Sequence, residues 1–334
     1  MSRPDADPVL VEAIRGAAVE SERRGACAVV DAQGKVVLAL GDIDRPVYAR
    51  SAIKPLQALP LIETGAADAF GLGSPEIALA CASHHGEPPH VAAVAAWLER
   101  LGLTAEDLEC GAHAPANPTA AQALIRAGAM PSALHNNCSG KHAGFLTTAR
   151  HLGEATRGYI DAGHPVQRRV LAVLETMTGL DLASAPRGID GCGIPVIGIP
   201  LRATARAMAR LADPAARGEA RAAAARRILE AMAAEPFMVS GSGTFTTAAM
   251  TAAGSAVRLK PGAEGMFCAA LPAMGLGVAL KIADGAARAA EVAMGAILCR
   301  IGALDQAQAE ALSPFLSPAI KNVAGRVVGN LRPA

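Results

Sequence analysis

Arg50-Ser51-Ala52-Ile53-Lys54-Pro55 is the stretch of this 334-residue chain that most constrains its fold and chemistry. The proline and the apolar residues that follow it at helical spacing predict a helix over residues 51–62. Ser51 and Lys54 would then share one helix face at the positive end of the helix dipole. Because a neutral lysine there can remove the serine proton, the stretch indicates nucleophilic catalysis, although a Ser-x-x-Lys match also arises by chance.

Lysine is rare in this chain, since only six of its 31 basic residues are lysines. Lys54, Lys141 and Lys260 lie in unusual polar motifs, whereas Lys35 follows a glycine in an expected turn and fits a surface position. A lysine ammonium can be desolvated and lose its proton, but arginine stays charged in proteins. A chain that prefers arginine is therefore expected to keep lysine where chemistry needs it.

The composition favours a globular protein that acts on a small molecule. Hydrophobic residues make up 51% of the chain and aromatic residues 3%, which predicts an aliphatic core with closely packed helices. The formal net charge of +1 gives no reason to expect nucleic acid as a partner. We expect no membrane span and no secretory signal, hence a cytoplasmic protein, and the hydrophobic content favours a homodimer.

The order of the expected elements predicts an α+β fold, with an antiparallel sheet from both ends of the chain packed against a largely helical region. We expect one catalytic unit over residues 1–334, with a sheet-containing lobe (1–50 and 190–334) and a helical lobe (51–189). Strands are expected at residues 9–14, 27–30, 36–40, 195–199, 244–249 and 255–259, and helices at 51–62, 75–82, 89–101, 119–127, 140–151, 165–177, 202–234 and 286–301. The arginines of residues 202–234 are expected on a solvated face.

Two further motifs carry candidate catalytic groups. Cys81-Ala82-Ser83-His84-His85-Gly86-Glu87 follows an apolar run and predicts a helix end that opens into a cleft, where Ser83 could act on a substrate and one histidine could orient it. Lys260-Pro261-Gly262-Ala263-Glu264-Gly265 follows a strand, and a Lys-x-Gly strand forms one wall of serine acyl-transfer sites. A capped helix end and a simple Pro-Gly turn are the respective alternatives.

A third group of polar residues contains thiols and an amine. Cys138, Lys141 and Cys192, completed by a water, could form a tetrahedral zinc site, although lysine is an uncommon ligand and inert buried cysteines are the alternative. The seven scattered cysteines do not form a disulfide framework. Asn137 and His142 could instead bind substrate, and Asp190 could anchor Lys141 from behind.

In order and spacing, these motifs together resemble the rhizobial-type L-asparaginases over nearly the whole chain. The resemblance implies a fold like that of serine β-lactamases and serine-dependent glutaminases. It also implies two Ser-Lys pairs, Ser51 with Lys54 and Ser83 with Lys260, and a zinc site formed by Cys138, Lys141 and Cys192. The motif residues expected to bind substrate are Arg50, His84, Asn137, His142 and Asp190. One departure is Pro261, where related sequences favour a hydroxyl residue and where proline lacks a backbone N–H.

The expected reaction is attack by Ser51 on the side-chain carboxamide of L-asparagine, with Lys54 as base and then as proton donor to ammonia. Ser83 and Lys260 would relay protons and stabilise the oxyanion, and zinc would organise the pocket. A glutaminase would use the same chemistry, since one methylene is worth only about 1–3 kcal/mol of discrimination. A penicillin-interacting enzyme would be exported, and a non-enzymatic amino-acid-binding protein would not need paired bases.

Overall fold

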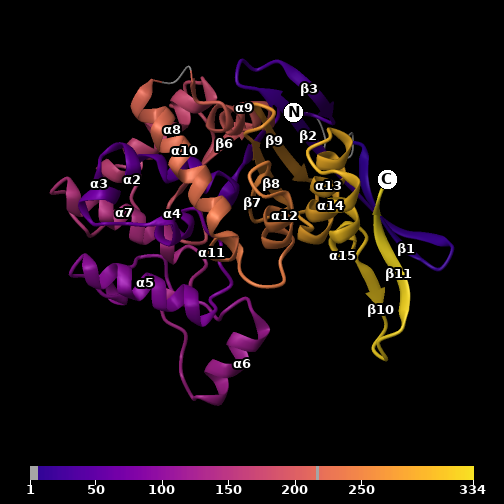
Figure 1. Cartoon of the computed structure of the whole chain (residues 1–334), viewed down its shortest axis with the longest axis horizontal. Coiled ribbons are helices and arrows are strands. Elements are labelled where there is room, and N and C mark those ends of the chain that lie inside the picture. Colours follow the sequence, from indigo (N-terminus) through magenta and orange to yellow (C-terminus); the bar gives the residue numbers. More distant parts are fainter. Residues whose placement is uncertain (1–6, 216–217) are drawn as a thin grey trace. The chain divides into compact units, whose positions relative to one another are not determined.

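The computed structural model describes residues 7–215 and 218–334, and the chain divides into two compact units (Figure 1). Unit 1 comprises Met1–Ala52, Gly198–Asp213 and Ala248–Ala334, and unit 2 comprises Ile53–Ile197 and Pro214–Thr247. The expected lobes grouped residues 190–334 with the sheet, whereas Pro214–Thr247 belongs to the helical unit. Within the described residues, no helix is long and apolar enough to cross a membrane.

Unit 1 is built on an antiparallel sheet that joins the two ends of the chain. In the described part of the chain it has eight strands in the order β10-β11-β1-β2-β9-β8-β7, with β3 paired to β2. Val11 of β1 pairs with Pro333 of β11, and these two strands lie side by side in Figure 1. The strands are β1 (Val9–Arg15), β2 (Ala18–Asp31), β3 (Val36–Leu40), β7 (Arg258–Pro261), β8 (Met266–Leu271), β9 (Leu276–Ile282), β10 (Ala319–Lys321) and β11 (Val327–Pro333). The predicted α+β fold with an antiparallel sheet from the chain termini is confirmed.

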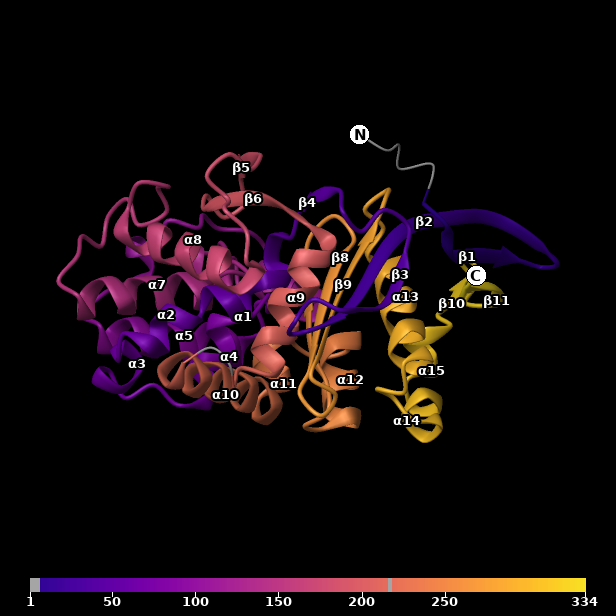
Figure 2. The same cartoon turned by 90° about the horizontal axis from the view of Figure 1, so that it is seen from above.

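Helices cover both faces of the unit 1 sheet. Helix α9 (Leu201–Ala212) packs on β9, β2 and β8, and α13 (Ala287–Arg300) lies on the other side of these strands (Figure 2). The contact with α9 is close because Gly277 has no side chain: a Cβ there would lie 2.1 Å from the Ala205 carbonyl oxygen. Beside α13 lie α14 (Gln306–Ala311) and α15 (Ser313–Leu316). The apolar faces of the sheet are thereby removed from water.

Unit 2 is a helical cluster around α4 (Ser74–Ala80). This helix contacts α7 (Ser139–His151), α5 (Pro88–Arg100), α10 (Glu219–Ala234) and α11 (Pro236–Ser240). Buried Trp97 of α5 ties that helix to α7 through a 3.0 Å hydrogen bond from its indole to Thr147. Other helices of unit 2 are α1 (Lys54–Gln57), α2 (Leu59–Glu63), α3 (Ala66–Ala69), η3 (Ala105–Asp107), α6 (Pro118–Arg126), η4 (Ala133–His135) and α8 (Pro165–Thr178).

A small sheet contains the predicted strand at residues 195–199. This strand, β6 (Pro195–Pro200), pairs through Gly198–Pro200 with β4 (Pro46–Tyr48) in unit 1. Its first residues pair with β5 (Arg187–Ile189) in unit 2. The strand thus runs directly from the segment that contains Cys192 into α9.

Proline explains two differences from the expected helices. The helix expected at residues 51–62 consists of η2 (Arg50–Ile53), α1 and α2, with Pro55 and Pro60 each in a first turn, where the missing N–H is tolerated. The helix expected at residues 202–234 is broken into α9 and α10, with Pro214 between them.

The strand predicted at residues 244–249 is wrong. Residues 245–249 belong to α12 (Phe245–Ala253), in which four alanines favour a helix and three threonines favour a strand. The strand expected at residues 255–259 begins later, at Arg258, where the Leu259 N–H contacts the Met250 sulfur of α12.

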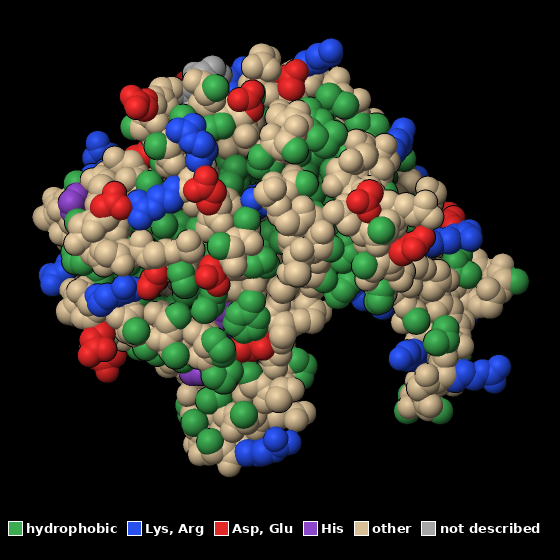
Figure 3. Space-filling view, in the orientation of Figure 1, with side chains coloured by type: hydrophobic (Ala, Val, Ile, Leu, Met, Phe, Trp, Pro, Cys, Tyr) green, Lys and Arg blue, Asp and Glu red, His purple; other side chains and the backbone are tan. Residues whose placement is uncertain are grey.

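The expectation of a solvated arginine face over residues 202–234 is met only in part. Arg210 is buried and donates to the Ala32 carbonyl in unit 1, whereas in unit 2 Arg221 pairs with Glu63. On the face shown in Figure 3, basic and acidic side chains are interspersed and no broad field of one sign gathers. That face gives no support to a nucleic-acid surface.

Candidate active site

In unit 1, the turn that contains Ser51 lies directly against the end of β7. A Cβ at Gly262 would lie 2.8 Å from the Ala49 carbonyl oxygen and 3.1 Å from the Ala52 nitrogen, so only glycine allows this approach. Lys260 precedes Gly262 on the same strand end, is fully buried, and donates from Nζ to the Pro261 carbonyl at 2.7 Å. The fold therefore brings the Ser51 and Lys260 motifs together.

Two residues in these motifs have strained backbone. Arg50 and Glu264 have φ angles of +51° and +59°, and they are the only non-glycine residues with positive φ in the part of the chain that the structure describes. Such a conformation costs about 1–3 kcal/mol in a non-glycine residue and is concentrated at functional sites. Both strained residues flank the contact between the Ser51 turn and β7.

In unit 2, the Lys54 amine joins two other motifs. Lys54 is fully buried, and its Nζ donates to the Ala82 carbonyl and, at 3.1 Å, to Ser83 Oγ. It also lies 3.5 Å from the Asn137 carbonyl. Sequence reasoning paired Ser83 with Lys260 only, so this contact between Lys54 and Ser83 adds a polar pair that the spacing of the motifs did not reveal.

His84 holds the loop of Ser83 against the start of α7. The ring is fully buried; its Nδ1 accepts from the Gly86 amide at 3.1 Å, so Nε2 carries the proton and donates to Ser139 Oγ at 2.8 Å. Burial first, and then the charge of His90, lowers the pKa of His84, which keeps the ring neutral. Since both ring nitrogens are used in this way, His84 positions the Ser83 loop.

The loop Gly241-Ser242-Gly243 lies beside the same motif and was missed by sequence reasoning. Ser242 donates to the Glu87 carboxylate from its backbone N–H at 2.8 Å and from its hydroxyl at 2.7 Å. Gly241 has a φ of +108°, and a Cβ there would lie 2.6 Å from Glu87. Closely spaced glycines between two helices were the available sequence signal.

Cys138, Lys141 and Cys192 converge in unit 2. Lys141 Nζ donates to Cys192 Sγ at 2.9 Å, and the two thiols share a hydrogen bond. That bond is the main cause that lowers the pKa of Cys138 and raises the pKa of Cys192, so the pair favours one thiolate at Cys138. Burial alone would lower the pKa of Lys141, but the two sulfurs raise it overall. Thiolates are soft donors that zinc binds well, and the Lys141 amine can add a nitrogen donor once it is deprotonated.

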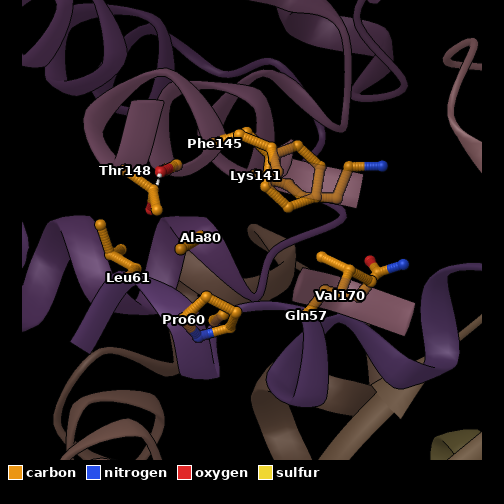
Figure 4. Close-up of a pocket in the computed structure, with 11 residues that line it drawn as sticks. Gln57, Pro60, Leu61, Ala80, Lys141, Phe145, Thr148 and Val170 are labelled. Carbon is orange, nitrogen blue, oxygen red and sulfur yellow. Dashed lines mark hydrogen bonds between the residues drawn. The ribbon is translucent and has the colours of Figure 1, made fainter. Parts of the chain in front are cut away.

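No cluster of three or more His, Cys, Asp and Glu residues that could hold a metal occurs in the described ranges, so the lysine is required for a third ligand here. Lys141 also lies 5.8 Å from the centre of the Phe145 ring. Figure 4 shows its ammonium pointing away from Leu61 and Thr148, which together with Lys141 line a cavity of about 10 Å³. That cavity can hold a single water at most and is too small for a substrate.

The other expected substrate-binding residues of unit 2 lie close to these groups. The Oδ1 atom of Asn137 lies 3.1 Å from Cys138 Sγ. His142 is fully buried, with Nδ1 2.8 Å from the Tyr159 hydroxyl. Asp190 is half-buried, and its charge is one of the causes that raise the pKa of Lys141, as expected of an anchor.

The expected site residues are divided between the two units. The proposed Ser51–Lys54 and Ser83–Lys260 pairs each join residues of different units, and they stay predictions. A second cavity of about 370 Å³, lined by apolar residues of α5 and α6 and by His135, contains none of the expected site residues. Unit 1 holds Arg50, Ser51 and Lys260, and unit 2 holds Lys54, Ser83, His84, Asn137, Cys138, Lys141, His142, Asp190 and Cys192.

Comparison with known proteins gives one strong match. The family model described as L-asparaginase II matches residues 11–333 of the chain. No curated protein sequence matches it. Among solved structures, a protein from Bacteroides dorei DSM 17855 named as a candidate β-lactamase is similar, with 14% sequence identity and a TM-score of 0.41 over 77% of this chain and 84% of that one.

Proposed function

This chain belongs to the L-asparaginase II family and is an L-asparaginase, and we propose that it hydrolyses L-asparagine through a serine nucleophile activated by lysine. The observation that carries the proposal is the buried Lys54 amine, which follows Ser51 by three residues and contacts Ser83 Oγ at 3.1 Å. A fully buried lysine among hydroxyl and carbonyl groups is placed for proton transfer and not for solubility.

In the proposed first step, Ser51 Oγ bonds to the side-chain carboxamide carbon of asparagine and gives its proton to the Lys54 amine. The resulting oxyanion needs hydrogen-bond donors, and we assign this role to backbone N–H groups of the Ser51 turn, because the start of a helical turn favours negative charge. The C–N bond then breaks, and Lys54 returns the proton so that ammonia leaves. An aspartyl ester of Ser51 remains.

In the second step, water attacks that ester, its proton passes to a base, and the Ser51 hydroxyl is restored as aspartate leaves. Ser83 and Lys260 are proposed to relay protons and stabilise the oxyanion. The contact between Ser83 and Lys54 supports the first of these roles, since it gives the proton on Lys54 a hydroxyl partner. The contact between Gly262 and the Ser51 turn supports the placement of the Lys260 strand in the site.

We propose that Cys138, Lys141 and Cys192 hold a zinc ion. The shared proton of the two thiols and the 2.9 Å contact between Lys141 and Cys192 fit this donor set, because zinc replaces protons on thiols and amines. When bound, zinc supplies a positive charge that can orient a substrate carboxylate. The three residues themselves fix the start of α7 and the loop of Asp190 beside Asn137.

The test is ammonia release from L-asparagine and from L-glutamine by the purified protein and by Ser51→Ala. Loss of the nucleophile is expected to lower kcat/KM for asparagine by about 10³-fold or more. Ser184→Ala is the matched control, because that serine is exposed and should leave the rate unchanged. Near-normal turnover by Ser51→Ala would reject the nucleophile, and preference for glutamine would identify a serine-dependent glutaminase.

We also propose a cytoplasmic homodimer. All seven cysteines are free thiols, which fits a reducing compartment. Ile125 in α6 and Met130 after its end are 76% and 85% exposed, which fits a protein contact. Light scattering of the purified protein at micromolar concentration tests the assembly, and a monomer mass would reject it.

A further inference from the structure

His142 has one ring nitrogen whose protonation state can be derived from its neighbours. Its Nδ1 lies 2.8 Å from the Tyr159 hydroxyl, and that hydroxyl accepts from the Glu109 backbone N–H at 2.8 Å. An amide can only donate, so the tyrosine oxygen is an acceptor in the Glu109 contact. Tyr159 is fully buried, so its own O–H proton also requires an acceptor.

His142 Nδ1 is the one acceptor that the hydroxyl contacts among the described residues. If Nδ1 carried a proton instead, the Tyr159 hydroxyl would be a buried donor without an acceptor, which costs about 1–3 kcal/mol. Nδ1 is therefore the unprotonated nitrogen, and Nε2 carries the proton. The same argument excludes a doubly protonated ring, so the contact with Tyr159 by itself selects the neutral Nε2–H tautomer.

The Nε2–H of His142 has no hydrogen-bond partner within the described part of the chain, although it is buried. A buried donor left in this way requires an explanation, and a ligand acceptor is the simplest. A charged acceptor makes the strongest partner for such an N–H, and an amino-acid ligand brings carboxylates that can supply it.

We propose that Tyr159 is a positioning residue that fixes His142 in its Nε2–H tautomer, so that this N–H donates to a carboxylate oxygen of the bound amino acid. The inference rests on the proposed function, because it takes the substrate and the product aspartate as the source of the carboxylate. Tyr159 itself does not touch the substrate. It acts through the hydrogen bond to His142, supported from behind by the Glu109 N–H.

Tyr159→Phe tests the proposal, because it removes the hydroxyl but keeps the ring that packs against His142 at 5.4 Å. Without the hydroxyl, His142 can adopt either tautomer. KM for asparagine and Kd for L-aspartate are expected to rise about 10- to 100-fold, and kcat to change less than about threefold. The other tyrosine, exposed Tyr48, provides the matched control Tyr48→Phe, which should change neither constant.

A second variant separates tautomer control from packing. Glutamine in His142→Gln supplies an N–H donor that has no tautomer to select, so adding Tyr159→Phe to this background should have no further effect on Kd. Equal penalties of Tyr159→Phe in both backgrounds would overturn the proposal, and so would an unchanged KM in the single variant.

Direct observation of the ring by ¹⁵N NMR of histidine-labelled wild-type protein tests the inference without catalysis. The His142 resonances should report protonated Nε2, which should shift when L-aspartate is added. Protonated Nδ1, or no shift on aspartate binding, would refute the proposal even if Tyr159→Phe did not fold. A protein that shows the expected tautomer and aspartate shift but releases no ammonia would instead refute the asparaginase mechanism.

Discussion

Gly140→Ala is expected to damage the candidate site although it adds only one methyl group. Gly140 lies in the first turn of α7, and a Cβ there would lie 2.4 Å from the Leu79 carbonyl oxygen and 2.7 Å from its carbon. Real Cβ atoms essentially never approach another heavy atom within 3.0 Å. The end of α4 must therefore move away from α7 by about 0.6 Å or more.

That movement acts on the chain that leads directly to Ser83. The Ala82 carbonyl and Ser83 Oγ accept hydrogen bonds from Lys54, and a shift of about 0.6 Å is enough to stretch the 3.1 Å bond to Ser83 beyond hydrogen-bond length. A misplacement of this order can lower a rate by about 10- to 100-fold. Overpacking is expected to cost about 1–3 kcal/mol of unfolding free energy, against a gain of up to about 1 kcal/mol from replacing a helical glycine.

Gly144→Ala is the matched control one turn later on α7. A Cβ there meets Ala80 and Leu61 at 3.5 Å, an ordinary contact, so this variant should keep its rate and lose no stability. The assay is kcat/KM for ammonia release from asparagine, with the thermal midpoint measured for both variants. If Gly140→Ala matches Gly144→Ala in rate and midpoint, the close packing of α7 on α4 does not control the site.

Burial raises the pKa of Glu291 to about 7, from an ordinary value of 4.5, so the folded state keeps a proton that the unfolded chain has lost between these values. The unfolding free energy of wild type should therefore fall as pH rises from about 4.5 to 7. Glu291→Gln should lack this fall, so that its unfolding free energy exceeds that of wild type at pH 8 by up to about 3 kcal/mol. An equal change of the thermal midpoint between pH 5 and pH 8 in both proteins would contradict this. One zinc per chain, measured by elemental analysis after dialysis, is expected in wild type and in the control Cys299→Ala but not in Cys192→Ala. Full zinc retention by Cys192→Ala would exclude that thiol as a ligand.

Much of the fold could be predicted from local sequence signals. The strands over residues 9–14 and 36–40 occur within one residue of the expected ends, because alternation and glycine turns are local properties. The strand prediction for residues 244–249 was wrong because the local alanines and threonines favour opposite structures, and packing such as the contact of Met250 with the start of β7 decides between them. Tertiary contacts decide such short segments.

The sequence predicted the reactive residues of the site but not the contacts between them. Ser83 and Lys54 are 29 positions apart, and nothing in either motif states that the amine of one contacts the hydroxyl of the other. Tyr159 and Glu109 lie in segments without a recognisable pattern, so their roles become visible only when the fold places them beside His142. The sequence identifies reactive groups, whereas their hydrogen-bond partners and tautomers depend on the fold.

The bias against lysine acquires a physical meaning in the structure. Lys54, Lys141 and Lys260 are 0%, 2% and 0% exposed, so half of the six lysines are buried. The buried arginines Arg210 and Arg258 instead donate to backbone carbonyls, a task that suits a permanently charged planar group. A compact amine is needed where the group must fit beside a hydroxyl or a thiol and exchange its proton. The lysines that remain buried in this arginine-rich chain are thus those that the proposed chemistry uses, and arginine could not replace them.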